Sequence, residues 1–417
     1  MAKNKLLIIS LDAVSNDDIA ILADCPTFRS LSEGGTLVYD VLPVFLSNTY
    51  PIHTSIITGC HPNKHGIKDN TLPEPGDAKP GWNWYSKEIK VPTLYQKASE
   101  LGLVTAGIFW PVTAGAPIKY NIPEILPKRP WENQLILSLT NGSPFFQMAS
   151  VLKHGKHLKG AFQPQLDDFS CAVLCDLIAD KRPDLMMIHF TDVDTHKHHF
   201  GINSSEAVAA VKRMDQRLGR LLTSLESSGL SQDCHVIVLS DHGMTDVKKS
   251  INPNKYLEKM GLLTYRRSGS VSSWKAWFKC SGGSGFLYLK NPEDQRTLLQ
   301  VRSIVDSLIQ DKESGIKGIL NEEEFFLSGL NQECAFGIIP SDGVEFVEHP
   351  QNAHYANHGY SLKENKYNTF YLLSGPRINN GLKLQGGSLL DITPLAANLL
   401  DIPLWDMDGK LRTDLFK

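Results

Sequence analysis

Short, uninterrupted apolar runs recur along this chain, and polar residues follow each of them. Runs of this length are typical of strands that are covered on both faces, as in a largely parallel sheet. Segments with helical periodicity lie between the runs, for example over residues 206–225. The alternation predicts an α/β fold with a largely parallel central sheet and helices on both faces. The predicted strands are residues 6–11, 104–109, 185–190, 236–239 and 370–373.

Residues 251–345 differ in texture from the rest of the chain. Pro, Ser and Gly are scattered through them, and a helical pattern runs over residues 295–310. Few residues of the kinds that perform catalysis occur there. We therefore predict a catalytic core formed by residues 1–250 and 346–417, with residues 251–345 inserted as a cap.

The charges and apolar segments exclude some classes of function. The 42 Lys and Arg nearly balance the 45 Asp and Glu, so the formal net charge is −3 and nothing favours binding to a nucleic-acid polymer. No apolar run reaches the ~18 residues that a membrane-spanning helix needs, so we expect no membrane contact. The composition leaves the oligomeric state open.

The cysteines and the N-terminal segment bear on the compartment. The seven cysteines are scattered and odd in number, which argues against a disulfide framework. The apolar stretch near the N-terminus breaks at Ser10 and Asp12, which makes it too short for a signal-peptide core. We expect a cytoplasmic protein.

Acidic residues and histidines follow several of the predicted strands. Asp12 follows the first strand, and Asp194 lies shortly after the third. Asp241 and His242 follow the fourth. Ligand sites in such sheets lie at the carboxyl ends of the strands, so these side chains should meet. Asp and His without Cys exclude a structural cysteine-type zinc site and indicate a hydrolytic centre with two divalent metals.

Four polar patches, taken together, resemble a known family. They are Ser10-Leu11-Asp12-Ala13; Thr49-Tyr50-Pro51; Asp194 with His198 and Gly201 after it; and Ser240-Asp241-His242-Gly243 with the distant Asn357-His358-Gly359. Their order and spacing resemble the alkaline phosphatase superfamily, and most closely its nucleotide pyrophosphatase/phosphodiesterase (type I phosphodiesterase) branch. The resemblance runs from Asp12 to Pro376, is weakest over residues 251–345, and implies an alkaline-phosphatase-like core.

The resemblance assigns roles to individual residues. Thr49 is the implied nucleophile; at the start of a predicted helix, backbone N–H groups would favour a phosphate beside its hydroxyl. Asn70 matches the position whose amide contacts a phosphoryl oxygen. The implied cofactors are two divalent metal ions, with Zn²⁺ favoured and Mn²⁺ or Fe left open. The implied ligands are Asp12, Asp241, His242 and the Thr49 oxygen for one metal, and Asp194, His198 and His358 for the other.

Some of these assignments have alternatives. Asp192 and His196 repeat the spacing of Asp194 and His198, but only the second pair has Gly201 three residues later, as the family pattern requires. The first pair would then orient ligands or lie on the surface. The nucleophile and the amide have simpler alternatives as a helix N-cap and a turn residue.

The implied activity is hydrolysis of phosphate diesters or nucleotide pyrophosphates through a phosphothreonine intermediate. The implied partner is a small-molecule phosphate ester or nucleotide. Phosphomonoesterase and phosphonate hydrolase activities remain alternatives, with Lys64, Lys68 and Lys87 as nearby cations that a monoester would need. A non-catalytic binding protein is a more distant alternative, because every expected ligand is present. Residues 82–85 with Trp110 offer either a stacking surface or core packing.

Overall fold

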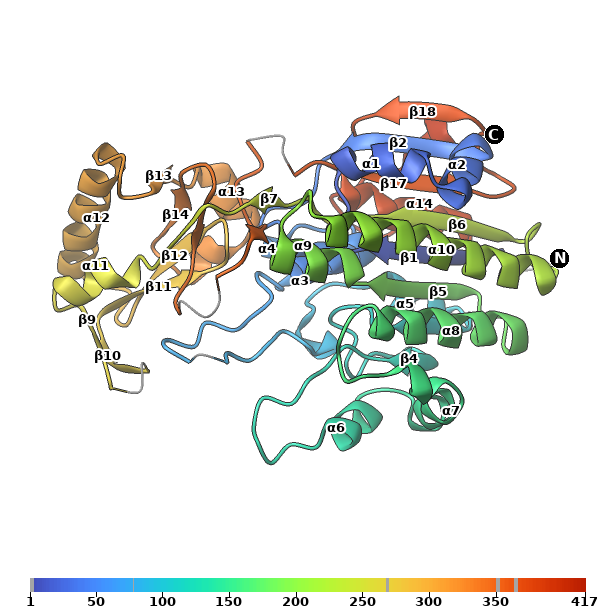
Figure 1. Ribbon diagram of the computed structural model, residues 1–417, viewed down its shortest axis with the longest axis horizontal. Helices are drawn as coiled ribbons and strands as arrows, with labels where there is room; N and C mark the ends of the chain where they lie inside the picture. The colour runs from blue at the N-terminus through green and yellow to red at the C-terminus, as the bar shows by residue number, and fades with distance from the viewer. Residues whose placement is uncertain (1–3, 78, 268–269, 350–352, 364–366) are drawn as a thin grey trace.

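An eight-stranded sheet forms the centre of the computed structural model, which describes residues 4–77, 79–267, 270–349, 353–363 and 367–417 (Figure 1). The strand order is β18-β2-β17-β6-β1-β5-β3-β4. Neighbouring strands run parallel except where β17 pairs with β2 and β6. The strands are β1 (Lys5–Leu11), β2 (Gly35–Val41), β3 (Thr105–Ile108), β4 (Tyr120–Ile122), β5 (Leu185–Phe190), β6 (Cys234–Leu239), β17 (Thr369–Ser374) and β18 (Leu382–Gln385).

All five predicted strands lie in this sheet, so the predicted α/β fold with a largely parallel sheet is confirmed. The last of them is β17, which runs antiparallel to both neighbours. An apolar run does not reveal the direction of a strand. The sequence did not predict β4, which has three residues, or β18, which is mostly exposed, because neither contains a continuous apolar run.

Side chains of β1 divide between two hydrophobic cores, because successive residues of a strand point to opposite faces. Leu7, Ile9 and Leu11 pack with α1, α2, α8 and α10. Leu6 and Ile8 pack with α3, α5 and α14. Helices therefore cover both faces of the sheet (Figure 1). They are α1 (Ile19–Ala23), α2 (Pro26–Glu33), α8 (Gln165–Asp180) and α10 (Ser205–Ser227), and on the other face α3 (Thr49–Thr58), α5 (Leu94–Glu100) and α14 (Ile392–Leu399).

A second, antiparallel sheet lies within residues 251–345. Its strand order is β11-β12-β14-β13, and it packs with α11 and α12 around a separate hydrophobic core. Figure 1 shows it at one end of the molecule. The cap interpretation and its boundaries stay a prediction. The elements are α11 (Asn254–Lys259), β9 (Leu263–Tyr265), β10 (Val271–Trp274), β11 (Ala276–Cys280), β12 (Gly285–Leu289), α12 (Gln295–Gln310), β13 (Ile316–Ile319) and β14 (Phe336–Pro340).

Shorter elements connect these parts of the chain. None of the described helices is both long enough and apolar enough to cross a membrane. All seven cysteines are free thiols, as the sequence predicted. The remaining elements are α4 (Pro62–His65), α6 (Gln134–Thr140), α7 (Pro144–His154), α9 (Asp192–Phe200), α13 (Glu322–Leu327), β7 (Thr245–Asp246), β8 (Lys249–Ile251), β15 (Val344–Phe346) and β16 (Ala356–Asn357).

Candidate active site

The predicted ligands converge at one edge of the central sheet. β5, β1 and β6 are adjacent and parallel, so their carboxyl ends lie side by side. Asp12 directly follows β1, and Asp194 lies in the first turn of α9, which follows β5. Asp241 lies two residues beyond β6. The strand order thus brings together carboxylates that are far apart in the sequence.

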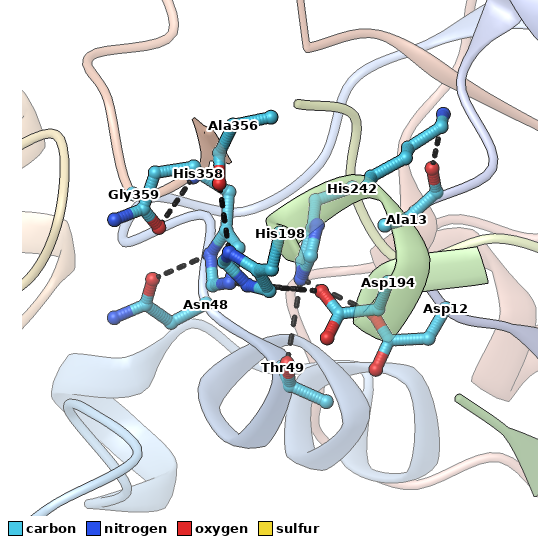
Figure 2. Close-up of polar contacts among 12 residues, drawn as sticks. Asp12, Ala13, Asn48, Thr49, Asp194, His198, His242, Ala356, His358 and Gly359 are labelled. Atoms are coloured by element: carbon cyan, nitrogen blue, oxygen red, sulfur yellow. Dashed lines mark hydrogen bonds and ion pairs between the residues drawn. The ribbon is translucent and has the colours of Figure 1, made fainter. Parts of the chain in front are cut away.

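Asp12, Asp241 and His242 form a first buried group, in which one ligand atom of each lies within 4.8 Å of the others. Nε2 of His242 lies 3.5 Å from Oδ1 of Asp12 and 3.3 Å from Oδ2 of Asp241. The hydroxyl of Thr49, the first residue of α3, lies 3.3 Å from the same nitrogen (Figure 2). Oδ1 of Asp241 accepts the N–H groups of Ala13 and His242, so only Oδ2 remains for a metal.

Asp194, His198 and His358 form a second group beside the first. Oδ1 of Asp194 lies 3.3 Å from Nε2 of His198 and 4.0 Å from Nε2 of His358. The rings of His358 and His242 stack with centroids 4.0 Å apart, which joins the two groups. Figure 2 shows Asp12, His242, Asp194, His198 and His358 on the side of α3 that carries Thr49.

Backbone carbonyls orient the histidines of the second group. Nδ1 of His198 donates to the carbonyl of Ala356 at 2.8 Å, and Nδ1 of His358 donates to that of Ser47 at 2.9 Å. A carbonyl only accepts, so Nδ1 carries the proton and a neutral ring keeps a free lone pair on Nε2. Proteins hold metal-binding histidines in this manner.

The electrostatics of the first group call for added positive charge. Burial, with the neighbouring carboxylates of Asp241 and Asp194, raises the pKa of Asp12 well above its ordinary value. Burial also raises the pKa of Asp241 to about 6 and lowers that of His242 to about 4. One carboxylate oxygen of each aspartate is buried without a hydrogen-bond partner. Divalent cations would compensate these oxygens, so the residues fit the predicted metals, and the donor set does not choose among Zn²⁺, Mn²⁺ and Fe.

The alternative ligand Asp192 faces away from both groups. It is fully buried, and its carboxylate accepts hydrogen bonds from Arg213 at 2.7 and 2.8 Å and from Arg217 at 2.8 Å. Nδ1 of His196 lies 2.9 Å from the same carboxylate. These contacts satisfy Asp192 without a metal and leave Asp194 as the carboxylate of α9 that reaches the site. Gly201 then ends α9 with a φ of 92°, a left-handed conformation that favours glycine.

Lys197 fixes α9 against the loop that carries Asp12. Its side chain is buried, and Nζ donates to the carbonyl of Ala13 at 2.9 Å and to Oδ2 of Asp18 at 2.5 Å. Ala13 has a φ of 60°, so two hydrogen bonds to its backbone, from Lys197 and to Asp241, hold an unfavourable conformation. Sequence reasoning missed this lysine, because its partner lies 179 residues away.

Asn70 lies in a loop beside the first turn of α3. Its Oδ1 accepts the N–H of Tyr50 at 2.8 Å, which fixes the orientation of the amide. Nδ2 makes no hydrogen bond to the described residues, so its N–H donors remain available beside Thr49. The placement fits the predicted contact with a phosphoryl oxygen, and this role stays a prediction.

A buried ion pair links the second sheet to the loop that carries Asp69 and Asn70. Nζ of Lys279, on β11, donates to Oδ2 of Asp69 at 2.5 Å, and both side chains are buried. Oδ1 of Asp69 accepts the Nδ2 of Asn48 at 2.7 Å and the N–H of Asn70 at 2.7 Å. Oδ1 of Asn48 in turn accepts Nδ1 of His358 at 2.9 Å. No sequence pattern pointed to Lys279, which lies in the region where few catalytic residue types occur.

Two further histidines support the first group. His189, on β5, lies 3.1 Å from Oδ2 of Asp12, so it orients that carboxylate. His53 bridges the carbonyl of Thr49 and the hydroxyl of Ser10, at 2.8 Å each. Burial lowers the pKa of both rings to about 3, which keeps them neutral.

The aromatic residues near the site divide between packing and exposure. Trp110 is fully buried and packs against His53, so it belongs to the core. Tyr50 packs against Trp82 and Trp84 with centroids 5.2 and 5.6 Å apart. Trp82 and Trp84 stack on each other, and Trp82, 37% exposed, is the one open to solvent.

Comparison with known sequences identifies the family. A sequence model described as "Type I phosphodiesterase / nucleotide pyrophosphatase" matches residues 6–361. Human ectonucleotide pyrophosphatase/phosphodiesterase family member 1 is 30% identical over 246 residues, which cover 56% of this chain and 23% of that protein. The chain therefore spans less than a quarter of that relative. An uncharacterized pyrophosphatase/phosphodiesterase of Schizosaccharomyces pombe is 24% identical, with 98% of this chain and 79% of the relative covered.

Comparison with solved structures supports the fold. Murine ectonucleotide pyrophosphatase/phosphodiesterase 5, solved as an inactive form in complex with AMP, matches with a TM-score of 0.72 and 19% identity over the full length of both chains. At this identity the likeness shows the fold alone, and it confirms the predicted alkaline-phosphatase-like core. The family model covers residues 6–361, most of the chain, and the chain therefore belongs to the type I phosphodiesterase/nucleotide pyrophosphatase family.

Proposed function

We propose that the chain is a metal-dependent hydrolase of phosphate diesters or nucleotide pyrophosphates, with Thr49 as its nucleophile. One observation carries the proposal: Thr49 is the first residue of helix α3, and its hydroxyl lies beside two groups of buried and half-buried Asp and His side chains. Family membership supports the same class of reaction, and the human relatives are named for it.

Residues of this chain would hold two divalent cations, for which Zn²⁺ is our first choice. When bound, the cations would stabilise negative charge on the phosphoryl group and lower the pKa of the Thr49 hydroxyl. The proposed ligands are Asp12, Asp241, His242 and the Thr49 oxygen for one cation, and Asp194, His198 and His358 for the other.

The reaction would proceed as two in-line displacements at phosphorus. Oγ1 of Thr49 attacks, its proton passes to water, and the bond to the leaving oxygen breaks as the bond to Thr49 forms. The product is a phosphothreonine that still carries the second ester group. Water then attacks the same phosphorus and Thr49 leaves, so two inversions retain the configuration. Asn70 and the N-terminus of α3 would donate hydrogen bonds to the phosphoryl oxygens throughout.

The lysines near the motifs favour a diester over a monoester. Nζ of Lys64 lies 2.6 Å from Asp408, and Nζ of Lys68 lies 2.6 Å from Glu333. Lys87 is exposed beside Glu88. A monoester carries an additional negative charge, and these cations are engaged elsewhere. Phosphomonoesterase activity is therefore the weaker alternative.

A small-molecule nucleotide is the substrate class that the comparisons support best. The murine relative was solved with AMP, and the human relatives are named nucleotide pyrophosphatases. Trp82 lies at the edge of the site and would offer an exposed ring for stacking on a base. We also propose a cytoplasmic location, which the seven free thiols support.

The test is to compare kcat/KM for an aryl phosphate diester and the matching monoester, with zinc-loaded protein and Thr49→Ala as the blank. We expect a preference for the diester of ~100-fold or more, lost in the blank. A preference for the monoester would overturn the proposed substrate class while leaving the nucleophile in place. Turnover of neither substrate would favour a non-catalytic binding protein.

A further inference from the structure

Exposed apolar side chains concentrate on one short segment of the chain. Of the twenty large apolar residues that are exposed among the described residues, nine lie within residues 126–162. Phe145 and Leu152 are 87% and 86% exposed, and Trp131 is 76% exposed. Scattered exposed apolar residues are ordinary, but a dense cluster marks an interaction surface. The nine are Leu126, Trp131, Leu135, Ile136, Phe145, Met148, Val151, Leu152 and Phe162.

The helices of this segment have the reverse of the usual arrangement. The buried residues of α7 are polar, Gln147 and Ser150, whereas Phe145, Met148 and Leu152 lie on its exposed face. No residue of α6 is buried, although four of its seven residues are apolar. Figure 1 shows both helices at the outer edge of the molecule, beyond β4 and α8. Phe146 of α7 and Leu137 of α6 pack partly buried against the cores, whereas the other apolar side chains named above face outward.

Polar contacts hold the two helices in this orientation. The hydroxyl of Ser138, on α6, donates to Oε1 of Gln147 at 2.5 Å, and Nε2 of Gln147 donates to the carbonyl of Ser138 at 2.9 Å. Gln147 is 4% exposed. Gln147 of α7 is thus held toward the interior, while Phe145, Met148 and Leu152 remain exposed on the outer side of the helix.

The segment also carries excess positive charge. Residues 126–162 contain five Lys and Arg and one acidic residue, in a chain whose net charge is −3. Lys128 pairs with Glu74, and Lys153 pairs with Asp176. The other three make no ion pair with the described residues. The guanidinium of Arg129 lies over the ring of Trp131, 5.4 Å from its centroid. These three are Arg129, Lys156 and Lys159.

We propose that the surface of residues 126–162, here called the α6–α7 surface, docks on an anionic lipid bilayer. Exposed Phe, Leu and Trp side chains would enter the boundary between headgroups and acyl chains, and the bases would contact lipid phosphates. A second copy of the chain fits less well, because a symmetric contact would bring two basic surfaces together. The sequence led us to expect no membrane contact, since it does not show which face of α6 and α7 is buried.

Only the Leu126 end of the α6–α7 surface lies close in the chain to a residue that reaches the candidate active site. Oε2 of Glu124 lies 3.9 Å from Nδ1 of His189, which itself contacts Asp12. Leu126, the first exposed apolar residue of the surface, follows Glu124 by two positions. Docking would therefore hold Glu124 close to the bilayer. The proposal concerns binding alone and does not depend on the proposed reaction.

The test is co-sedimentation of the full chain with vesicles of phosphatidylcholine and phosphatidylserine, and with vesicles of phosphatidylcholine alone. We expect binding to the anionic vesicles that weakens as salt rises. The affinity of the double variant Phe145→Glu, Leu152→Glu for anionic vesicles should fall by about tenfold or more. The double variant Lys156→Glu, Lys159→Glu should lose a similar amount. The control is Leu299→Glu, which alters an exposed leucine on α12, outside the α6–α7 surface, and should leave vesicle binding as in the unmodified chain.

Three results would overturn the proposal. The first is no binding to anionic vesicles. The second is binding that the control variant weakens as much as the two test variants do. The third is a dimer, measured by light scattering, that Phe145→Glu, Leu152→Glu converts to a monomer while vesicle binding is absent. Because all altered side chains are exposed, unchanged thermal unfolding of the variants would show that the fold is intact.

Discussion

The central sheet and the second sheet contribute to the candidate site in different ways. The strand ends of the central sheet carry Asp12, Asp194 and Asp241, the groups that would bind metal. The second sheet carries no predicted ligand, yet its Lys279 is buried against Asp69 in the loop beside Thr49. In the proposed mechanism the central sheet would supply the reacting groups, and the second sheet would hold the loop of Asp69 in position.

Besides the ion pair of Lys279, the second sheet makes a close backbone contact with the loop that carries His358. The N–H of Gly283 donates to the carbonyl of His358 at 2.8 Å. A Cβ at Gly283 would lie 2.1 Å from the ring of Tyr360, so only glycine permits this approach. The loop that carries His358 therefore rests on the second sheet, and the comparison predicts that changes in the two regions differ in kind.

The largest effect should come from the nucleophile. Thr49→Ala removes the hydroxyl that the mechanism requires, so kcat for the diester should fall about 10⁴-fold or more with no loss of thermal stability. Thr49→Ser keeps a hydroxyl and is the matched control, with the larger part of the activity retained. If Thr49→Ala kept an activity within about tenfold of the unmodified protein, Thr49 would not be the nucleophile, and the central sheet would not have the role proposed for it.

The two aspartates of α9 should separate chemistry from stability. Asp194→Asn should lower kcat about 10³-fold and reduce the bound metal per chain, because it removes a proposed ligand. Asp192→Asn should instead lower the free energy of unfolding by about 1.5–3 kcal/mol, because Arg213 loses its carboxylate partner and the buried Arg217 keeps only Asp168 and Asp167. Activity assays, metal analysis and denaturant unfolding would distinguish them. Loss of activity and metal in Asp192→Asn, with loss of stability in Asp194→Asn, would instead support Asp192 and His196 as the metal ligands.

Lys279→Met tests the role of the second sheet. It leaves the buried Asp69 carboxylate unpaired, so Asn48 and Asn70 should lose their fixed positions. We expect kcat/KM to fall about 10- to 100-fold while metal content stays near that of the unmodified chain. Lys275→Met, an exposed lysine next to the same strand, is the control. Equal effects of the two changes would mean that the second sheet does not position the site.

The smallest expected effect is a pH dependence that arises at Glu348, which contacts Trp277 and Cys280 of the second sheet. Burial raises the pKa of Glu348 to about 7 from 4.5, although hydrogen bonds from Trp277 and the Cys280 backbone oppose the shift. The folded protein thus binds more protons than the unfolded chain between these values, and the free energy of unfolding falls as pH rises through them. Relative to Glu348→Gln, the unmodified chain should lose about 1–2 kcal/mol between about pH 5 and 7.5 in urea unfolding. An increase in the free energy of unfolding over that pH range, relative to Glu348→Gln, would contradict the prediction.

The sequence predicted the central sheet well because its buried strands have continuous apolar runs. It did not predict the direction of β17 or the outward apolar faces of α6 and α7. Both depend on which surfaces meet, and periodicity alone does not contain that information.

The candidate site was predictable where spacing is local and not where contacts are distant. Asp194 and His198 lie on one helix and Gly201 ends it, so the family pattern could be matched locally and favoured Asp194 over Asp192. Lys279 lies 210 residues from Asp69, and no local pattern points to it. The distant residues support the site rather than form it, which is why the motifs did not include them.

The most direct test of the account is to trap the covalent intermediate. The zinc-loaded chain is quenched in acid during turnover of a phosphate diester, digested and analysed by mass spectrometry. The account predicts a phosphoryl adduct on the peptide that contains Thr49, absent from Thr49→Ala. Sustained turnover without any adduct, or an adduct on another residue, would contradict the assignment of Thr49 as the nucleophile.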